Sequence, residues 1–381
     1  MAWIDELKHN IGTIKQLKQH IRLTPREEKL LEKVVGRHPM SISRYYLSLI
    51  DVDDPDDPIR RMIVPSVEEL DLSGSYDPSR ELQNTKVPGV QHKYASTALI
   101  LTTNRCASYC RYCFRKRLVG LPSKEVVQKF EVAAEYIREH KEINNVLISG
   151  GDPFVLSTKV IKKFIDELST IEHLDFVRFG TKSLVTFPQR ILEDEELLNI
   201  LRVYSRNNKR VYVVTQFNHE RELTEKSVRA IRRFQRAGIV LSNQTVLLNG
   251  VNDNPDALSR LMRMLVIVGV NPYYVFQCRP VKRVKKMFQV PLYNGFRVVE
   301  QASSMLDGHG KRFRYVMSHR TGKVEMIGIM GDEMYFKYHQ AKDPKNMGRF
   351  FKRKLSTTAG WLDDLEHIHP EMSQASSHST I

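Results

Sequence analysis

Three of the four cysteines lie within eight residues, and their spacing restricts the fold more than any other feature of the chain. Cys106, Cys110 and Cys113 follow the pattern C-x3-C-x2-C. Closed zinc and iron–sulfur sites take four protein ligands, so three thiolates are one too few. A four-iron cluster held by three cysteines keeps one iron free to bind another molecule. The spacing therefore predicts an open iron–sulfur site.

Three other uses of these cysteines have to be weighed. A zinc site needs a fourth ligand nearby, and none of the usual Cys/His spacings follows. A bacterial ferredoxin segment reads C-x2-C-x2-C-x3-C-P, which this chain lacks. Disulfides would leave one clustered cysteine unpaired and suit a secreted protein. The fourth cysteine, Cys278, is more typical of strand packing than of a cluster ligand.

The composition is that of an ordinary globular protein, with 41% hydrophobic and 27% charged residues. Its 381 residues suffice for one elaborated barrel domain or two smaller domains. No apolar run is long enough to span a bilayer, and the first ten residues carry acids where a signal peptide would be basic and then apolar. We expect a cytoplasmic protein without membrane contact, because an oxygen-sensitive cluster needs a reducing compartment.

The net charge of +15 raises the question of a nucleic-acid partner. The basic residues are spread along the chain, however, and none is interleaved with the aromatic pattern of an RNA-binding sheet. We interpret most of them as solvated helix faces and some as contacts to cofactor phosphates. No nucleic-acid partner is predicted.

The first 50 residues read as helices. Apolar residues recur at steps of three and four from Ile4 to Ile21, which predicts one helix face. Thr24 and Pro25 predict the start of a second helix that ends near Gly36. Residues 41–50 predict a third, and the Asp- and Pro-rich residues 51–66 predict an ordered connecting loop.

From Thr97 the pattern alternates between strands and helices. Apolar, β-rich runs cover Thr97–Thr103, Asn145–Ser149, Phe176–Thr181, Arg210–Gln216, Val240–Leu247 and Pro272–Gln277. Helical patterns lie between them, such as Ser123–His140 with Ser123 as N-cap, and Glu193–Ser205. Six strands at this spacing predict parallel βαβ units, in either a partial (βα)6 barrel or a doubly wound sheet.

The remainder of the chain differs from this alternation. The stretches RFRYVMS and KVEMIGI predict strands that flank a turn at residues 319–322, and the last ten residues predict disorder. His367 and His369 lack the carboxylate or cysteine neighbours of a metal site, so we expect them to be unliganded. We divide the chain into an N-terminal helical region with its connecting loop (1–95), a barrel (96–318) and a C-terminal segment (319–381).

The run Ser149-Gly150-Gly151-Asp152-Pro153 ends the second predicted barrel strand, where glycines let backbone approach a ligand closely. Together with the cysteine spacing, it resembles the radical S-adenosylmethionine (SAM) enzymes. The resemblance implies a [4Fe-4S] cluster on the three cysteines, SAM bound to the open iron, and a contact from Gly150, Gly151 and Asp152 to SAM. It also implies an α/β fold with a partial (βα)6 TIM-type barrel, which carries its chemistry at the carboxyl ends of the strands.

Further motifs are similar to those of the lysine 2,3-aminomutase family. They are CRYCFRKR, SGGDP, Arg178–Thr181, Asn218-His219, Asn243–Asp253 and Asn271–Tyr274. This resemblance implies a second cofactor, pyridoxal 5'-phosphate (PLP), and transfer of an amino group from C2 to C3 of a small amino acid. It also implies an external electron donor of flavodoxin or ferredoxin type and a homo-oligomer.

The same resemblance assigns roles to individual residues. Lys323 matches the lysine that joins PLP, although the glycine-rich turn before it is shorter here. Lys93 and Arg111 match basic contacts to the PLP phosphate, and a third family arginine falls at Thr97. Arg115 matches the residue that pairs with the substrate α-carboxylate, a task that suits the planar guanidinium. Asn218, His219 and Gln244 belong to motifs that we assign to cofactor binding.

Substrate choice is where the chain departs from the family. Members that act on lysine hold its ammonium with two aspartates, which fall here at Arg279 and near Ser318. An arginine repels an ammonium and suits a carboxylate, as in the glutamate 2,3-aminomutases. We therefore expect glutamate or another amino acid with an anionic or polar side chain. Two alternatives remain: lysine, with Asp253 contacting its ammonium, and an iron–sulfur protein without PLP that binds an acidic macromolecule. No structural zinc is expected, because the C-terminal cysteines that could bind it are missing.

Overall fold

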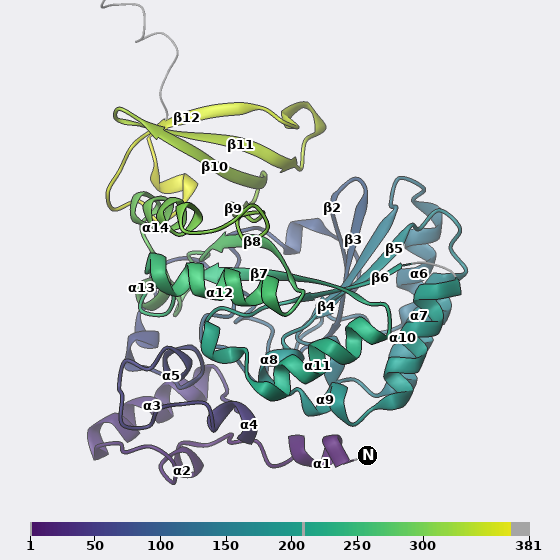
Figure 1. The fold of residues 1–381 in the computed structure, drawn as a ribbon, viewed down its shortest axis with the longest axis horizontal. Coiled ribbons are helices and arrows are strands. Elements are labelled where there is room, and N and C mark those ends of the chain that lie inside the picture. The colour runs from purple at the N-terminus through teal and green to yellow at the C-terminus, as the bar shows by residue number, and fades with distance from the viewer. Residues whose placement is uncertain (1, 208–209, 367–381) are drawn as a thin grey trace, which may run out of the picture.

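A single twelve-stranded sheet runs through the protein, with its strands in chain order from β1 to β12. The computed structural model describes residues 2–207 and 210–366. Within this part of the chain the first and last strands do not pair, so the sheet stays open (Figure 1). Neighbouring strands are parallel from β3 (Thr97–Thr103) through β4 (Asn145–Gly150), β5 (Phe176–Gly180), β6 (Arg210–Thr215), β7 (Val240–Leu247) and β8 (Asn271–Gln277) to β9 (Arg314–His319).

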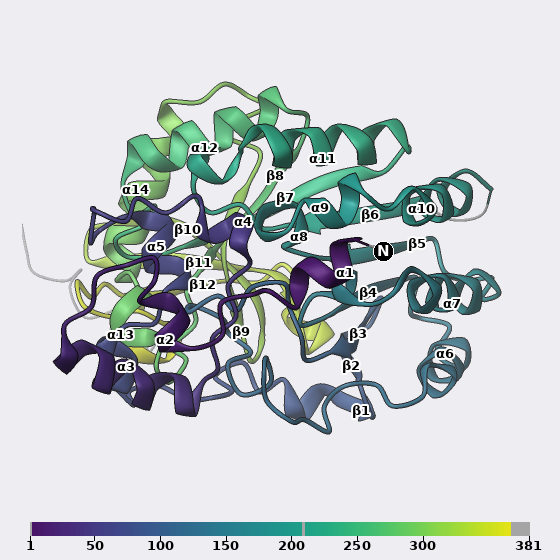
Figure 2. The same ribbon diagram turned by 90° about the horizontal axis from the view of Figure 1, so that it is seen from below.

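Helices cover the outside of the parallel strands, as Figures 1 and 2 show. They are α6 (Phe130–Glu139), α7 (Thr158–Ser169), α8 (Ser183–Thr186), α9 (Gln189–Leu192), α10 (Glu195–Asn207), α11 (Glu225–Arg236), α12 (Pro255–Ile267), α13 (Lys285–Phe288) and α14 (Leu292–Ser304). Each long helix buries an apolar stripe; in α11 this stripe contains Ala230, Ile231 and Phe234. The predicted partial (βα)6 barrel is confirmed, and β9 adds a seventh parallel strand.

The first barrel helix begins later than predicted. Residues 123–128 are not helical, and α6 starts at Phe130 with Lys129 at the N-cap. The Ser123 hydroxyl instead accepts a hydrogen bond from the Glu125 N–H in a turn. The Val127 N–H donates to the Leu101 carbonyl at 2.7 Å, so this amide binds β3 in place of a helical carbonyl.

The N-terminal region is helical but more broken than predicted. Its helices are α1 (Ala2–Leu7), α2 (Ile14–Leu17), α3 (Pro25–Arg37), α4 (Arg44–Leu47) and α5 (Pro58–Ile63). The single helix expected from Ile4 to Ile21 is wrong, because Ile11 forms a β-bridge with Ile42 and Thr13 caps a new helix. The helix at Pro25 is confirmed, with a capping box between Thr24 and Glu27. The third predicted helix shortens to α4, and the connecting loop contains α5.

The sheet continues past the parallel strands at both ends. Before them lies a hairpin of β1 (Thr85–Val87) and β2 (Val90–Tyr94). After them come the antiparallel strands β10 (Gly322–Met330), β11 (Glu333–Ala341) and β12 (Phe350–Lys354). The predicted turn at residues 319–322 is confirmed by the pairing of His319 with Gly322, whereas β11 and β12 were not predicted.

Short 3-10 turns complete the described chain at Val67–Leu70, Leu82–Asn84, Pro153–Val155, Glu220–Glu222, Pro344–Asn346 and Leu362–Asp364. Among the described residues, no helix combines the length and the apolar character needed to cross a membrane. The predictions for His367, His369 and the last ten residues concern positions that lie outside the described residues.

Candidate active site

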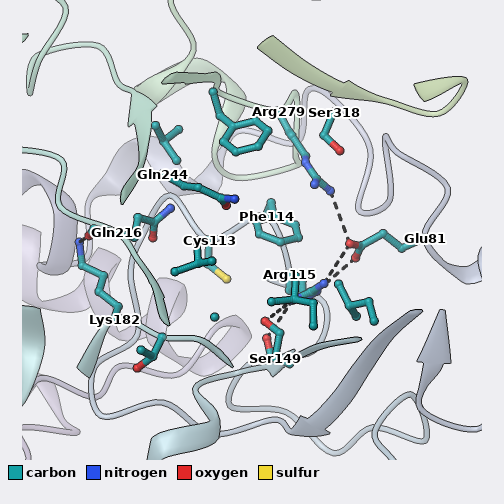
Figure 3. Close-up of a pocket in the computed structure, with 18 of the residues that line it drawn as sticks. Glu81, Cys113, Phe114, Arg115, Ser149, Lys182, Gln216, Gln244, Arg279 and Ser318 are labelled. Atoms are coloured by element: carbon teal, nitrogen blue, oxygen red, sulfur yellow. Dashed lines mark hydrogen bonds and ion pairs between the residues drawn. The ribbon is translucent and has the colours of Figure 1, made fainter. Parts of the chain in front are cut away.

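A cavity of about 360 Å³ lies within the parallel strands (Figure 3). All seven of these strands contribute to its wall, through Leu99, Ser149, Arg178, Thr215, Gln244, Phe276 and Ser318. Most of the predicted site residues border it: Lys93, Cys106, Cys110, Cys113, Arg115, Gly150, Gly151, Asp152, Gln244, Arg279 and Lys323. Arg111, Asn218 and His219 do not. The fold thus gathers residues from β2 to β10 around one space.

The three cysteines lie on the loop that follows β3, and the N-terminal region holds this loop in place. The Tyr109 N–H donates to the Ser41 carbonyl and the Arg111 N–H to the Met62 carbonyl, both at 2.8 Å. The Ser43 N–H donates to the Ser108 hydroxyl at 3.0 Å. The loop is therefore fixed by backbone contacts to a separate region of the chain.

Burial raises the pKa of all three cluster-loop thiols, to about 11 for Cys113. Cys106, Cys110 and Cys113 lie near enough to one another that the charges of Cys110 and Cys113 each further raise the pKa of Cys106. In the described part of the chain, no three His, Cys, Asp or Glu side chains converge tightly enough to hold a single metal ion. The three thiols instead border a wider common space, which suits a cluster of several irons rather than one zinc.

The turn after β4 packs directly against the cysteine loop. The Gly151 N–H donates to the Thr103 carbonyl at 2.6 Å, and the Asp152 N–H donates to the Arg105 carbonyl at 2.7 Å. A Cβ atom on Gly151 would lie 2.2 Å from the Arg105 carbonyl oxygen. Gly150 has a φ of +119° and equally little room. Both positions therefore require glycine for this close approach.

Asp152 joins this turn to the next one. Its carboxylate accepts hydrogen bonds from the Thr181 and Ser183 hydroxyls and from the Lys182 N–H, at 2.7 to 2.9 Å. Burial raises the pKa of Asp152, and these hydrogen bonds oppose that rise. Asp152 thus fixes the loops after β4 and β5 at the cavity wall.

Lys182 also borders the cavity, although no motif in the sequence singled it out. Its Nζ donates to the Glu222 carboxylate at 2.9 Å and to the Tyr112 hydroxyl at 3.0 Å. The predicted cofactor residue Asn218 lies behind this network, where its amide donates to the same Tyr112 hydroxyl at 2.7 Å. His219 caps the following 3-10 turn. Asn218 and His219 therefore support the cavity wall from behind rather than facing the cavity.

Arg111 is not brought to the cavity, contrary to the prediction. Its guanidinium donates to both oxygens of the buried Glu69 carboxylate, at 2.7 and 2.6 Å. The Lys116 ammonium binds the same carboxylate at 2.6 Å. Burial disfavours the charged carboxylate, yet Arg111 and Lys116 outweigh this effect and lower the pKa of Glu69 to about 2. Arg111 is thus committed to the N-terminal region, away from any phosphate in the cavity.

Glu81 organises the cations at one side of the cavity (Figure 3). Its carboxylate accepts from Arg115 at 3.2 Å and from Arg117 at 3.0 Å, and it lies 3.6 Å from an Arg279 nitrogen. Arg115 and Arg279 also stack on the Phe114 ring, at 4.7 and 4.0 Å from its centre. Burial opposes ionisation of Glu81, but the three arginines lower its pKa to about 2. One carboxylate is thus shared by three arginines.

Sequence reasoning missed Glu81. It lies in the segment before β1, and its partners are 34 to 198 positions away along the chain. The one available signal was general: two arginines predicted to lie inside a barrel require an acidic partner. Nothing in the pattern indicates which of the 44 acidic residues supplies it.

Two lysines face another part of the cavity. Burial, followed by the nearby charges of Arg178 and Lys93, lowers the pKa of Lys323 to about 7. Burial likewise lowers the pKa of Lys93 to about 7. The Lys93 Nζ donates to the His319 carbonyl at 2.5 Å. The Lys323 Nζ lies 4.2 Å from the centre of the Tyr274 ring and makes no hydrogen bond to the described residues. Lys323 is therefore the more available amine.

Comparison with known proteins agrees with this arrangement. The family model described as the Radical SAM superfamily matches residues 100–262, which include the cysteine loop and the strands up to β7. The chain is 42% identical over 349 residues to the "Putative L-lysine 2,3-aminomutase" of Aquifex aeolicus, covering 91% of this chain and 93% of that protein.

Two further relatives carry different substrate names. The L-lysine 2,3-aminomutase of Clostridium subterminale is 36% identical over 310 residues, covering 81% of this chain and 73% of that protein. The glutamate 2,3-aminomutase of Clostridioides difficile is 36% identical over 308 residues, covering 80% of this chain and 71% of that protein. Equal identity to both means that overall similarity does not distinguish lysine from glutamate.

Proposed function

The chain belongs to the radical SAM 2,3-aminomutase family, and from that premise we propose that it moves the amino group of a non-cationic amino acid from C2 to C3. The reaction is an isomerisation. A C3–N bond replaces the C2–N bond, and one hydrogen moves from C3 to C2, so no atom is gained or lost. Glutamate is the substrate that we favour.

Cys106, Cys110 and Cys113 are the residues that would hold the cluster. When bound, the cluster and SAM supply the radical that takes a hydrogen atom from the substrate, with an electron from an external donor of flavodoxin or ferredoxin type. The chain itself excludes water, since the cavity lies inside the barrel beneath a loop pinned to the N-terminal region. Gly150 and Gly151 line the cavity and let the turn after β4 pack against the backbone of the cysteine loop. The oxygen sensitivity of such a cluster supports a cytoplasmic location.

Lys323 is the residue that would hold PLP. The fit rests on its amine, which has no hydrogen bond within the described residues and a pKa of about 7. An uncharged amine is the form that can attack a carbonyl, so this lysine is reactive at neutral pH. When bound, PLP supplies a conjugated system that stabilises an unpaired electron on the substrate. Lys93 supplies positive charge nearby.

One observation carries the choice of substrate: Arg279 faces the cavity with unused donors. Its only described ionic contact is the 3.6 Å approach to Glu81, and its guanidinium donates no hydrogen bond within the described chain. Glu81 is already surrounded by Arg115, Arg117 and Arg279, so it offers no net negative charge to an ammonium. A carboxylate on the substrate side chain matches these unused donors.

The two alternatives, a lysine substrate and an iron–sulfur protein that binds an acidic macromolecule, account for fewer of these contacts. Asp253, which could contact the ammonium of a lysine substrate, does not line the cavity, and its carboxylate accepts from the Gly250 N–H at 2.9 Å. An iron–sulfur protein that binds an acidic macromolecule would use surface cations. The cations that support our proposal lie inside the barrel, where only a small molecule can reach them.

Product analysis tests the proposal. The protein would be reconstituted anaerobically with iron, sulfide and PLP, and supplied with SAM, a strong reductant and either glutamate or lysine. We expect 3-aminoglutarate from glutamate and little product from lysine. We also expect Lys323→Ala to lose the visible absorbance of lysine-bound PLP. Formation of only β-lysine would contradict the substrate assignment.

A further inference from the structure

Arg178 is a cation inside the barrel without a counter-ion. It lies on β5, borders the cavity and pairs with no carboxylate among the described residues. One of its terminal nitrogens donates to the Asn145 side-chain carbonyl at 2.5 Å. Its Nε is buried and has no hydrogen-bond partner in the described chain. A buried donor left unpaired destabilises the fold, so an uncompensated guanidinium here requires an explanation.

The surroundings of Arg178 are cationic and hold no acid. The charges that act on Lys323 are those of Arg178 and Lys93, and no carboxylate is among them. The groups that act on Arg178 are the Tyr273 and Tyr274 hydroxyls. Glu81 and Asp77 act on Lys93, but no carboxylate of the chain acts on Arg178, so this guanidinium is an uncompensated positive charge at the cavity, which is the electrostatic pattern of an anion site.

This cationic group lies away from the cysteine loop. Asn145 is the first residue of β4, and Thr97 is the first residue of β3. The two are paired neighbours in the sheet, and Asn145 also pairs with the first residue of β5. Arg178 itself is the third residue of β5 and pairs with Leu147, and its side chain reaches toward the amino ends of the strands at Asn145. The cysteine loop and the Gly150 turn follow their carboxyl ends.

Neighbouring residues hold the guanidinium in one orientation. The Asn145 side-chain amide donates to the Ser96 carbonyl at 2.9 Å and to the Thr97 hydroxyl at 3.1 Å, which leaves its carbonyl to accept from Arg178. One edge of the guanidinium is therefore fixed by Asn145. The other terminal nitrogen, Nη1, donates no hydrogen bond within the described residues and is the donor available to a ligand in the cavity.

We propose that Arg178, with Lys93 beside it, binds the phosphate of PLP. This inference rests on the proposed function and adds a residue to it. A guanidinium matches a phosphate with paired hydrogen bonds, which an ammonium cannot provide. Arg178 lies beside Thr97, the position where the family resemblance places a third arginine.

The test compares PLP with pyridoxal, which lacks the phosphate. Binding of both is followed by visible absorbance in the full chain and in Arg178→Met. We expect the variant to lose PLP affinity by roughly 10- to 100-fold, the range for a charged hydrogen-bonded contact, with pyridoxal affinity nearly unchanged. Arg314→Met is the matched control, since Arg314 lies outside the cavity and pairs with Glu325; it should retain both affinities.

A second variant covers the case in which Arg178→Met does not fold. Arg178→Lys keeps the charge and loses the planar fork, and we expect an intermediate preference for PLP over pyridoxal. An unchanged preference in a folded variant would overturn the assignment of Arg178 alone. If the unaltered protein binds PLP no more tightly than pyridoxal, the phosphate site is overturned. If it binds neither, the proposed function fails with it.

Discussion

At the scale of single residues, the side of the cavity around Glu81 holds more positive than negative charge. Glu81 is the carboxylate that meets Arg115 and Arg279, and it is shared with Arg117 as well. Phe114 supports the guanidinium planes of Arg115 and Arg279. Arg115 also donates to the Gly150 carbonyl at 3.2 Å, so it is more constrained than Arg279. The unused donors of Arg279 are therefore best suited to a carboxylate from outside the chain.

Reversing the charge at position 279 tests whether Arg279 binds the side-chain carboxylate of the substrate. We expect Arg279→Asp to lower kcat/KM for glutamate by roughly 100-fold or more, because the side-chain carboxylate of the substrate loses its arginine partner and meets the negative charge of Asp instead. The new carboxylate lies beside Glu81 in a mostly buried place and should lower the melting temperature, but kcat/KM of the folded protein should fall far more than the folded fraction. Steady-state kinetics and thermal unfolding measure the two effects.

The matched control is Arg297→Asp, which makes the same charge change on exposed α14, outside the cavity. It should keep the glutamate activity of the unaltered chain. Full activity in Arg279→Asp would show that the substrate side chain does not contact Arg279.

At the scale of elements, the cavity depends on how closely the turn after β4 approaches the cysteine loop. Backbone hydrogen bonds of 2.6 and 2.7 Å join the two, and a side chain at Gly151 would collide with the Arg105 carbonyl. Gly151→Ala must push the loops apart, because the obstacle is backbone rather than a flexible side chain. We expect a lower melting temperature and less than half of the iron content after reconstitution. Iron analysis and thermal unfolding measure these effects.

Gly328→Ala is the control for this substitution. Gly328 lies in β10, and a Cβ atom there would meet nothing within 4 Å. We expect it to bind as much iron as the unaltered chain. Equal iron content in Gly151→Ala would mean that the close approach of the turn is not needed to assemble the cluster loop.

The elements themselves were largely predictable, for a local reason. The parallel strands are short β-rich runs separated by helical patterns, and β3 and β7 have the predicted bounds. The errors lie where distant backbone intervenes. Val127 pairs with Leu101 in place of a helical bond, and Ile11 pairs with Ile42. No periodicity in residues 123–128 or 4–21 encodes these partners.

The site residues divide in the same way, into those set by the local sequence and those set by distant partners. The cysteines and the Gly150–Gly151 turn lie at the cavity as expected, because their spacing and backbone geometry are set within a few residues, and their use in binding a cluster and SAM stays a prediction. Arg111 was expected at the cavity but lies elsewhere, because a sequence does not show which buried acid an arginine meets. Its partner, Glu69, lies 42 positions earlier. Glu81 was missed for the same reason.

At the scale of the whole molecule, the N-terminal region acts as part of the barrel. Glu69 is fully buried and carries the ion pairs to Arg111 and Lys116, which flank the third cysteine of the loop. Together with the backbone contacts at Tyr109 and Arg111, these pairs join a helical region to the catalytic loop. We therefore expect the described chain to unfold as one cooperative unit rather than as separate domains.

Glu69→Gln tests this coupling. Removing the charge leaves two buried cations without their partner, so we expect the free energy of unfolding at pH 7 to fall by about 3 kcal/mol, in one transition. The Glu69 pKa of about 2 lies below that of an exposed glutamate, so its charge stabilises the folded state above pH 4 to 5, and this contribution is lost as the pH falls toward 2. The difference in the free energy of unfolding between the variant and the unaltered chain, measured with urea, should therefore become smaller as the pH falls over that range. Glu68→Gln, at a half-buried neighbour 4.0 Å from Arg61, should unfold like the unaltered chain at every pH. If the loss of unfolding free energy in Glu69→Gln does not change with pH, the proposed role of the Glu69 charge is contradicted.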